Sequence, residues 1–469
     1  MPKQVIAAVV LLLLLVQVTP TTAQTQPDEI VCKRDVIVQI DDWLSKLSDK
    51  FYGDVLAFPA IFEATNAKAK IDDSYATIDD VDLIEPGWKL CIVGVEQAQE
   101  IVGFEFDNPP LLDDTPLNLT GAIKIGAVQA LTGPLASQGK SIQSGIELAV
   151  QEINQTQLLG NGTLEIIWED SRGSSEQAAA AFRKLIEQEQ VAAILGPTLS
   201  QSAFAADPLA QAAGVPVIGT SNVAEGIADI GDYIFRTSLP ESTVISNTVR
   251  RTTELLNLQN VVIVFDRGNS FSTLSMAQFS QALAASGVEI LATVPFTTGA
   301  ADFSGQFSAL ETLSPDAIIL VALSEDAANI IAQARQAGVS DDVQFIGANS
   351  FNSDNFLRVG GQAVDGVFSG AAWNIGGEST SNRNFVAAYQ AEYGRPPDEL
   401  AAQAYSAVWV LAWALRGADA TDGALVRDSL ARLSPVETPL GLLNFAKNGD
   451  PNHVPVLQVV EDGTFKLLP

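Results

Sequence analysis

The sequence has very few of the residues on which metal and redox sites depend. Its 469 residues include one histidine, two cysteines and two methionines. A structural zinc site usually takes about four Cys or His ligands, which this composition does not supply. The one histidine, His453, stands near Pro451 and Pro455, and we expect it to be solvent-exposed in a loop. We therefore expect no bound metal and no cofactor.

Basic residues are also scarce. The chain has 26 Lys and Arg against 56 Asp and Glu, which gives a net charge of −30. Nucleic acids and anionic membrane surfaces are bound through basic patches, so this balance argues against both as partners. The acidity is explained by solubility, and it does not by itself identify a cationic ligand.

The common catalytic motifs are missing too. We find no Gly-x-Ser-x-Gly, no His-Glu-x-x-His, no Walker loop and no cysteine pair with redox spacing. Composition alone leaves an Asp/Glu hydrolase open. Asp170 and Asp266 each follow an expected strand, however, and we expect them to cap the next helix. The sequence thus predicts that the protein is not an enzyme and has no catalytic residues.

The longest apolar run is too short to cross a bilayer. It is Val5–Val16, whereas a spanning helix needs about 20 residues. Lys3 precedes the run and Thr21-Thr22-Ala23 follows it, which predicts a signal peptide over residues 1–23. An uncleaved anchor is the alternative. We expect an exported protein, either periplasmic or extracellular at the cell surface.

The two cysteines, Cys32 and Cys91, both lie in the N-terminal part of the chain. In an exported protein an isolated pair of cysteines indicates a disulfide. Closing a loop of this length stabilises a small domain by about 4 kcal/mol in the chain-entropy model. We therefore predict a disulfide between them.

The stretch from Ile123 to Asn154 indicates the class of the fold. A short apolar run of β-forming residues is followed by a Gly/Pro turn and then by apolar residues at helical spacing, namely Ile142, Ile146, Ala149, Val150 and Ile153. This order is the first half of a βαβ unit. Ligands of such sheets bind beyond the carboxyl ends of the strands, so residues 129–139 form a candidate ligand loop.

The same alternation continues to the C-terminus and predicts an α/β protein with parallel sheets. Expected helices include 176–188 and 327–337. The expected strands are 164–168, 191–195, 215–218, 261–265, 290–294, 317–323 and 343–346.

Short segments within residues 123–397 resemble a known family in their order and spacing. They include Ile-Lys-Ile-Gly from Ile123, Leu-Thr-Gly-Pro-Leu-Ala-Ser-Gln-Gly from Leu131, Gly145–Asn154, Glu169-Asp170, Gly196-Pro197, Gly214-Val215-Pro216, Phe235-Arg236-Thr237, Asp302-Phe303-Ser304, Gln333-Ala334-Arg335 and Ala388–Pro397. Together they resemble type I periplasmic binding proteins, and among these the leucine/isoleucine/valine-binding receptors of ABC transporters. The resemblance implies two doubly wound parallel-sheet lobes over residues 121–469. The first would hold about 121–237 and 373–444, and the second about 238–372 and 445–469.

Residues 30–94 precede this region and have the pattern of a small α+β domain in the order β-α-α-β. Phe51-Tyr52-Gly53-Asp54, Asn66 and Pro86-Gly87 resemble a lysin motif, a family that binds N-acetylglucosamine glycans such as peptidoglycan. The usual Gly-Asp-Thr of the first turn is Asp41-Asp42-Trp43 here, so a structural spacer is the alternative. We expect residues 95–120, which are rich in Pro and Asp, to form a linker.

The resemblance also implies a carboxylate site in the first lobe. Ser200 aligns with the family's carboxylate-binding serine, at the start of a helix whose backbone N–H groups favour an anion. A helix-capping role for Ser200 is compatible with this. The backbone at Ser221 aligns with a second contact, and Val223 stands where relatives have a hydroxyl.

Other aligned positions depart from the family. Gln138, Ser270 and Ser324 stand where many relatives have tyrosines over the ligand, although Phe271 is an alternative to Ser270. Asn349 stands where relatives have an acidic residue for the ligand's amine. A neutral, hydrogen-bonding lining suits a polar ligand better than leucine.

We therefore expect an exported receptor that binds a small polar ligand, an amino acid or an amide-like compound, and delivers it to an ABC permease in the membrane. A sensory or wall-tethered protein that uses the same fold without transport is the alternative. Peptidoglycan is a further candidate partner through the N-terminal domain, and nucleic acid is not expected.

Overall fold

The computed structural model divides the chain into two compact units, residues 1–116 and 117–469. It describes residues 30–38, 42–81, 83–85, 87–106, 117–298, 302–303, 307, 313–340 and 342–468. The predicted signal peptide lies outside the described residues, as do Asp41, Pro86 and the Pro- and Asp-rich part of the expected linker. Among the described residues, no helix is both long and apolar enough to cross a bilayer.

The N-terminal unit is built on a two-stranded antiparallel sheet with its own apolar core. Leu47, Phe51 and Ile61 from its helices pack against the sheet residues Leu90 and Ile92. Its elements in chain order are β1 (Cys32–Ile37), α1 (Leu44–Tyr52), the short η2 (Val55–Ala57), α2 (Phe58–Ala69), β2 (Lys89–Val93) and α3 (Val95–Val102). The strand and helix order up to β2 is β-α-α-β, but a lysin-motif identity remains a prediction.

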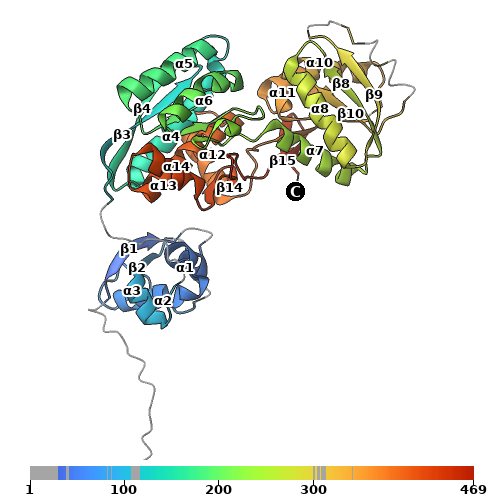
Figure 1. The fold of residues 1–469 in the computed structure, drawn as a ribbon. Coiled ribbons are helices and arrows are strands. Elements are labelled where there is room, and N and C mark those ends of the chain that lie inside the picture. Colours follow the sequence, from blue (N-terminus) through green and yellow to red (C-terminus); the bar gives the residue numbers. More distant parts are fainter. Residues whose placement is uncertain are drawn as a thin grey trace, which may run out of the picture. The chain divides into compact units, whose positions relative to one another are not determined.

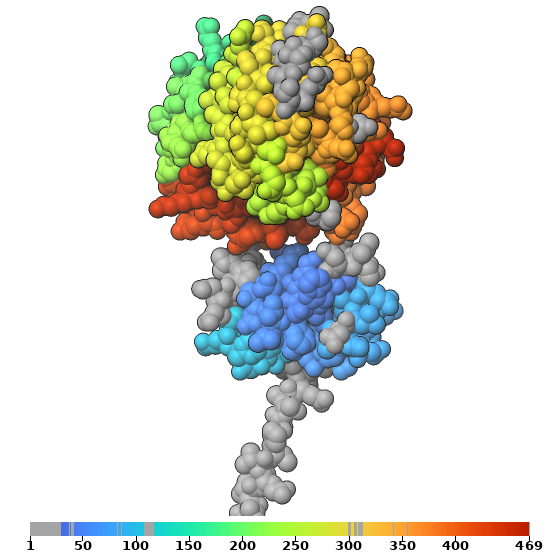
Figure 2. All heavy atoms as spheres, turned by 90° about the vertical axis from the view of Figure 1, so that its right-hand side faces the viewer, coloured from blue at the N-terminus to red at the C-terminus, as the bar shows by residue number. Residues whose placement is uncertain are grey.

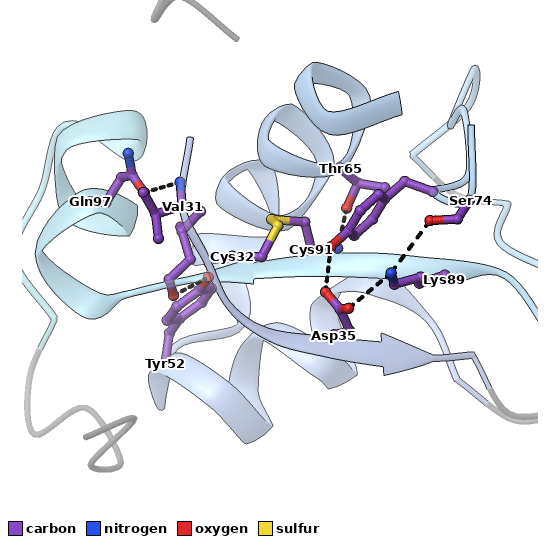
Figure 3. Close-up of a disulfide and its surroundings, with 11 residues drawn as sticks. Val31, Cys32, Asp35, Tyr52, Thr65, Ser74, Lys89, Cys91 and Gln97 are labelled. Carbon is purple, nitrogen blue, oxygen red and sulfur yellow. Dashed lines mark hydrogen bonds and ion pairs between the residues drawn. A yellow bond between two sulfur atoms is a disulfide. The ribbon is translucent and has the colours of Figure 1, made fainter. Parts of the chain in front are cut away.

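The predicted disulfide is confirmed: Cys32 and Cys91 are bonded, with their Cα atoms 5.2 Å apart. It joins the two strands beside a line of polar contacts (Figure 3). In these contacts Lys89 Nζ lies 2.9 Å from Asp35 Oδ2, and the Cys91 N–H donates to Thr65 Oγ1.

The start of the expected linker is helical instead. Helix α3 begins at Val95, and its Ala98 is fully buried in the core of the N-terminal unit together with Phe106. The small domain therefore extends past residue 94. The sequence did not predict this helix because its apolar residues, such as Ala98, Ile101 and Val102, are few and stand among Glu and Gln.

The first lobe of the 117–469 unit contains a five-stranded parallel sheet in the order β4-β3-β5-β6-β7. Its strands are β3 (Thr120–Gln129), β4 (Asn161–Asp170), β5 (Ala193–Leu195), β6 (Val217–Gly219) and β7 (Ile234–Arg236). One face packs on α4 (Ala136–Thr156), α13 (Glu399–Ala418) and α14 (Gly423–Ala431), and the other on α5 (Ser175–Lys184) and α6 (Ser200–Ala213). Figure 1 labels the strands β3 and β4 together with the helices α4, α5 and α6. A π-helical turn, η3 (Leu185–Glu189), extends α5, and α12 (Thr380–Tyr393) adds Phe385 and Tyr389 to the core of the first face.

The second lobe contains a seven-stranded sheet in the order β16-β15-β12-β11-β10-β8-β9. The strands from β8 to β12 run parallel, and β15 and β16 pair antiparallel at one edge. They are β8 (Asn260–Asp266), β9 (Glu289–Phe296), β10 (Ala317–Val321), β11 (Gln344–Gly347), β12 (Phe368–Ala371), β15 (Val456–Glu461) and β16 (Thr464–Leu467). Helices α7 (Glu241–Leu256) and α8 (Ser270–Ala285) cover one face, and α10 (Ser324–Gln336) and α11 (Asp354–Gly360) the other. Short 3-10 turns η4 (Ala228–Ile230), η5 (Asn349–Phe351) and η6 (Gly361–Val364) and a hairpin of β13 (Val436–Thr438) and β14 (Gly441–Leu443) complete the unit.

The chain passes between the lobes after β7, after β12 and after β14. Figure 2 turns the second lobe toward the viewer and shows yellow, orange and red segments, from distant parts of the sequence, on one continuous surface. The α/β class with two parallel-sheet lobes, predicted from alternating strands and helices, is thus confirmed.

Candidate functional site

The predicted ligand residues all follow the carboxyl ends of parallel strands, where ligands bind in sheets of this kind. Gln138 comes after β3, Ser200 after β5, and Ser221 and Val223 after β6. In the second lobe, Ser270 and Phe271 follow β8, Ser324 follows β10 and Asn349 follows β11. The topology thus places these positions in loops at one edge of each sheet, the edge formed by the carboxyl ends of the strands. We call this edge the ligand edge.

In the first lobe, hydrogen bonds join the loop after β5 to the loop after β6. The Ser221 hydroxyl donates to the Thr198 carbonyl at 2.7 Å, and the Asn222 side-chain amide donates to the Pro197 carbonyl at 2.8 Å. The Ser200 hydroxyl accepts from the N–H of Ala224 at 3.3 Å. The two loops are therefore held together by hydrogen bonds of their own.

No side chain of the described residues caps the start of α6, so its first backbone N–H groups can donate to an acceptor from outside the helix. Its N-cap residue is Leu199, whose side chain makes no capping hydrogen bond, and Ser200 is the first helical residue rather than the cap. The first N–H groups of a helix have no partner within the helix, and together with the helix dipole they favour an anion. Ser200, half-buried, stands at this end and does not cap its own helix through its side chain.

The remaining predicted positions are less closely connected. The half-buried Val223 accepts through its carbonyl from the N–H of Glu241 at 3.0 Å. The Ser324 hydroxyl donates to the Ser350 carbonyl at 2.8 Å, next to Asn349. Ser270 and Gln138 are exposed, and Phe271 is half-buried. Among the described residues, no hydrogen bond links Gln138, Ser270 or Phe271 to the other predicted positions.

Asn349 contacts an acidic residue that the sequence did not single out. Its Nδ2 donates at 2.8 Å to Glu399, the first residue of α13 in the first lobe. Glu399 also accepts from Asn352 Nδ2 at 2.8 Å and from the Ala372 N–H at 3.1 Å. Burial raises the pKa of Glu399, and the hydrogen bonds from Asn349 and Asn352 oppose that shift.

Glu241, the first residue of α7, is the second such residue. It is only 5% exposed, and its Oε1 has no hydrogen-bond partner among the described residues. Burial, followed by the charges of Glu399 and Glu225, raises the pKa of Glu241 to about 8. Two buried acidic residues thus adjoin loops that carry predicted positions, since Glu399 accepts from Asn349 and the Glu241 N–H donates to Val223. In a chain with 56 acidic residues, only the fold could reveal these two.

Two expectations for strand-end aspartates are wrong. Asp170 accepts from the N–H groups of Leu131 and Arg172 at 2.9 Å and so orders the loop between β3 and α4. Asp266 accepts from the Gly268 N–H at 2.9 Å. Ser174 and Asn269 cap the helices that follow, because their side chains accept from backbone N–H groups in the first turns of α5 and α8.

The expectation of an exposed His453 is also wrong. The side chain is 5% exposed, and its Nε2 lies 3.0 Å from the Thr237 carbonyl. The segment that carries it fills the junction between the lobes rather than looping into solvent. Burial lowers the pKa of His453 to about 4, so the ring is neutral near pH 7.

A hollow of about 160 Å³ lies at the second crossing, away from the predicted site residues. It is lined by residues such as Trp373, Asn374, Ser379 and Leu440. No charged or polar group of the ligand edge contributes to it. In the part of the chain that the structure describes, no three His, Cys, Asp or Glu side chains are grouped to hold a metal ion.

Comparison with known proteins agrees with this architecture. The sequence profile of a family described as periplasmic binding protein matches residues 122–464. The leucine-, isoleucine-, valine-, threonine- and alanine-binding protein of Pseudomonas aeruginosa is 24% identical over 332 residues, which cover 70% of this chain and 87% of that protein. The Leu/Ile/Val-binding protein of Escherichia coli K12 is 24% identical over 350 residues, 74% of this chain and 91% of its own.

Solved structures match over the same share of the chain. The branched-chain amino acid transporter substrate binding protein of Streptococcus pneumoniae, solved in complex with isoleucine, is 27% identical. The match covers 74% of this chain and 99% of that chain, with a TM-score of 0.64.

Proposed function

Because this chain belongs to the periplasmic binding protein family, we propose that it is an exported receptor that captures a small polar ligand between its lobes for uptake by an ABC transporter. The ligand is an amino acid or an amide-like compound. Proteins of this family are solute-binding receptors, and the relatives named above bind branched-chain and other amino acids. The identity of this chain's ligand and its permease partner belong to the proposal.

The observation that carries the proposal is the uncapped start of α6. A ligand carboxylate at this position accepts hydrogen bonds from the first N–H groups of the helix and from the Ser200 hydroxyl. The loop 219–224 supplies further backbone groups at Ser221, and its hydrogen bonds to Thr198 and Pro197 hold it in place. No basic side chain is needed, which fits a strongly acidic protein.

The polarity of the ligand follows from the side chains that replace aromatic cover. Gln138 and Ser270 are exposed polar residues, and Ser324 is half-buried. An aliphatic ligand side chain gains little from such neighbours, whereas an amide or hydroxyl group can pair with them. We therefore expect weak or absent leucine binding.

Capture requires the lobes to close. The chain passes between the lobes in three segments, an arrangement that supports a hinge motion in which a ligand that contacts both lobes favours the closed state. Small-angle scattering with and without a saturating ligand tests this, since closure reduces the radius of gyration. Identical profiles at saturation would contradict hinge closure.

A thermal-shift screen of the full chain against amino acids, amides, sugars and nucleosides tests the ligand class. A receptor is stabilised by its ligand in proportion to the logarithm of ligand concentration over Kd. The expected result is a shift with polar amino acids or amides. Leucine binding at micromolar level or better would show that the polarity of the site is misjudged.

The N-terminal unit supports a second role, attachment to the cell wall. It has a separate apolar core and its own disulfide, so it can act as an independent module. Retention of the full chain on purified peptidoglycan, compared with a chain that begins at residue 117, tests this role. Equal retention of the two would leave the unit as a spacer.

A further inference from the structure

Three glutamates from different segments gather where the ligand loops of the two lobes meet. Glu225 lies in the loop after β6, Glu241 starts α7, and Glu399 starts α13. The charges of Glu225 and Glu399 both act on Glu241. The backbone N–H of Glu241 donates to Val223, so this cluster adjoins the loop that carries Ser221.

The three carboxyl groups differ in the hydrogen bonds that they accept. Glu399 accepts from Asn349, Asn352, Gln403 and the Ala372 N–H. Glu225, which is exposed, accepts from the Ser242 N–H at 3.3 Å and from Gln278 Nε2 at 3.4 Å. Glu241 Oε1 accepts from no described residue although it is buried. A buried acceptor without a donor costs about 1–3 kcal/mol.

A second acceptor is left open on Asn349, which donates to Glu399, one of the two residues whose charges act on Glu241. Asn349 Oδ1 is also buried and has no hydrogen-bond partner in the part of the chain that the structure describes. The amide orientation is fixed by chemistry, because the Nδ2 of Asn349 must face the carboxylate of Glu399; the opposite orientation would set oxygen against oxygen. The amide oxygen of Asn349 therefore stays unpaired as long as this contact is kept.

Nearby positive groups are already engaged. Arg236, which donates to the carbonyls of Asn222 and Ala224 in the same loop, is paired with Asp450 at 2.6 Å. His453 is neutral because burial lowers its pKa to about 4. The start of α7 favours an anion at Glu241, since Pro240 offers no capping side chain. What Glu241 lacks is a donor that carries positive charge.

We propose that Glu241 and the amide oxygen of Asn349 receive a cationic nitrogen group of the ligand, and that Glu241 loses its proton when this group binds. The carboxylic acid becomes a carboxylate, the proton passes to the solvent, and the cation keeps its own protons. The proton is present beforehand because burial and the two neighbouring carboxylates raise the pKa of Glu241 to about 8. A cation in contact with Glu241 reverses that shift.

This inference rests on the proposed function and identifies a second group of the ligand, in addition to its carboxylate. A carboxylate at α6 and a cationic nitrogen at Glu241 together select an amino acid or a compound of the same charge pattern. The acid at the ligand edge is then supplied from α7, although the aligned family position is Asn349. Proton release makes ligand affinity depend on pH, with tighter binding as the pH rises toward 8.

Calorimetric titration of the full chain tests the proposal. The probes are the twenty standard L-amino acids, followed by the 2-hydroxy acid counterpart of the tightest binder. That binder is titrated at pH 7.0 in phosphate and in Tris, whose ionisation enthalpies differ, so that proton release is counted directly. The matched variants are Glu241→Gln and, on the exposed end of the same helix, Glu254→Gln. Thermal melting checks that both fold.

The expected result is release of about one proton per ligand by the wild type. Glu241→Gln abolishes the release and weakens binding at least tenfold, while Glu254→Gln changes neither, and the 2-hydroxy acid binds at least tenfold more weakly. Binding without proton release, or unchanged affinity in Glu241→Gln, would overturn the assignment and leave the receptor function standing. If none of the amino acids binds, the assignment of Glu241 falls, and the thermal-shift screen with amides decides separately whether the proposed receptor function stands.

Discussion

The side-chain amide of Asn349 donates a 2.8 Å hydrogen bond to Glu399 and so connects the ligand edge of the second lobe to a helix of the first. Asn352 makes a bond of the same length to the other carboxylate oxygen. Asn352 Oδ1 in turn accepts from Gln458 on β15 at 3.1 Å. One carboxylate thus links α13, the loop after β11 and, through Asn352, the last strand pair.

Removing that carboxylate should be costly. Glu399→Ala leaves the amides of Asn349 and Asn352 and the Ala372 N–H without their acceptor, and we expect the free energy of unfolding to fall by ~2–4 kcal/mol. Urea unfolding measures the change. Glu392→Ala, at an exposed position of α12, is the control and should cost under ~0.5 kcal/mol. Equal effects of the two would show that the network adds nothing to stability.

Loss of the Ser200 hydroxyl should weaken ligand binding and leave folding intact. Ser200→Ala removes one hydrogen bond to a charged group, so we expect a loss of ~1–3 kcal/mol in binding free energy for the ligand found by thermal-shift screening. Calorimetry measures it. Ser280→Ala is the control, because that hydroxyl donates to the Met276 carbonyl of its own helix. An unchanged Kd in Ser200→Ala would place the carboxylate elsewhere.

The disulfide should stabilise only the N-terminal unit. The double change Cys32→Ser and Cys91→Ser is expected to lower its free energy of unfolding by ~2–5 kcal/mol and to leave the melting of residues 117–469 unchanged. Scanning calorimetry resolves the two transitions. Peptide mapping without reductant should recover Cys32 and Cys91 as one cross-linked pair, and two free thiols in exported protein would refute it.

Acidification should destabilise the junction that holds His453. The pKa of His453 is lowered from 6.5 to about 4 on folding, so between these values the unfolded chain binds more protons. Stability from this group is therefore full above pH 6.5 and is lost as the pH falls toward 4. Melting curves from pH 7 to 4.5 should show a steeper loss for the wild type than for His453→Gln. Parallel curves would mean that the ring stays accessible to protons.

The sequence predicted elements whose apolar residues occupy one face. In α4, Ile142, Ile146 and Ile153 recur at helical spacing and are buried in the structure. It did not single out α13, which is buried on nearly all sides and therefore lacks a polar face. Nor did it identify β12, whose four residues include Ser369 and Gly370 and form a strand only because β11 and β15 flank them.

The site was predictable only where local sequence positions the residue. Ser200 follows a strand and begins a helix, so its place at the ligand edge could be inferred from the chain order. Glu241 and Glu399 are 158 positions apart and meet only after the lobes have formed, and a glutamate in an acidic chain is normally solvated. His453 was misjudged for the same reason, since its partner Thr237 is distant in sequence.

The first lobe is built from segments that lie far apart in the sequence and are therefore synthesised at different times. Asn118, just before β3, donates through its N–H and its side chain to Asp419, at 2.6 Å in each case and across a sequence separation of 301 residues. The sheet face that carries Ile123 and Ile125 is covered by α13, which the ribosome makes long after that sheet. A nascent chain therefore holds an uncovered apolar face until most of the protein has emerged, which keeps it a substrate for chaperones.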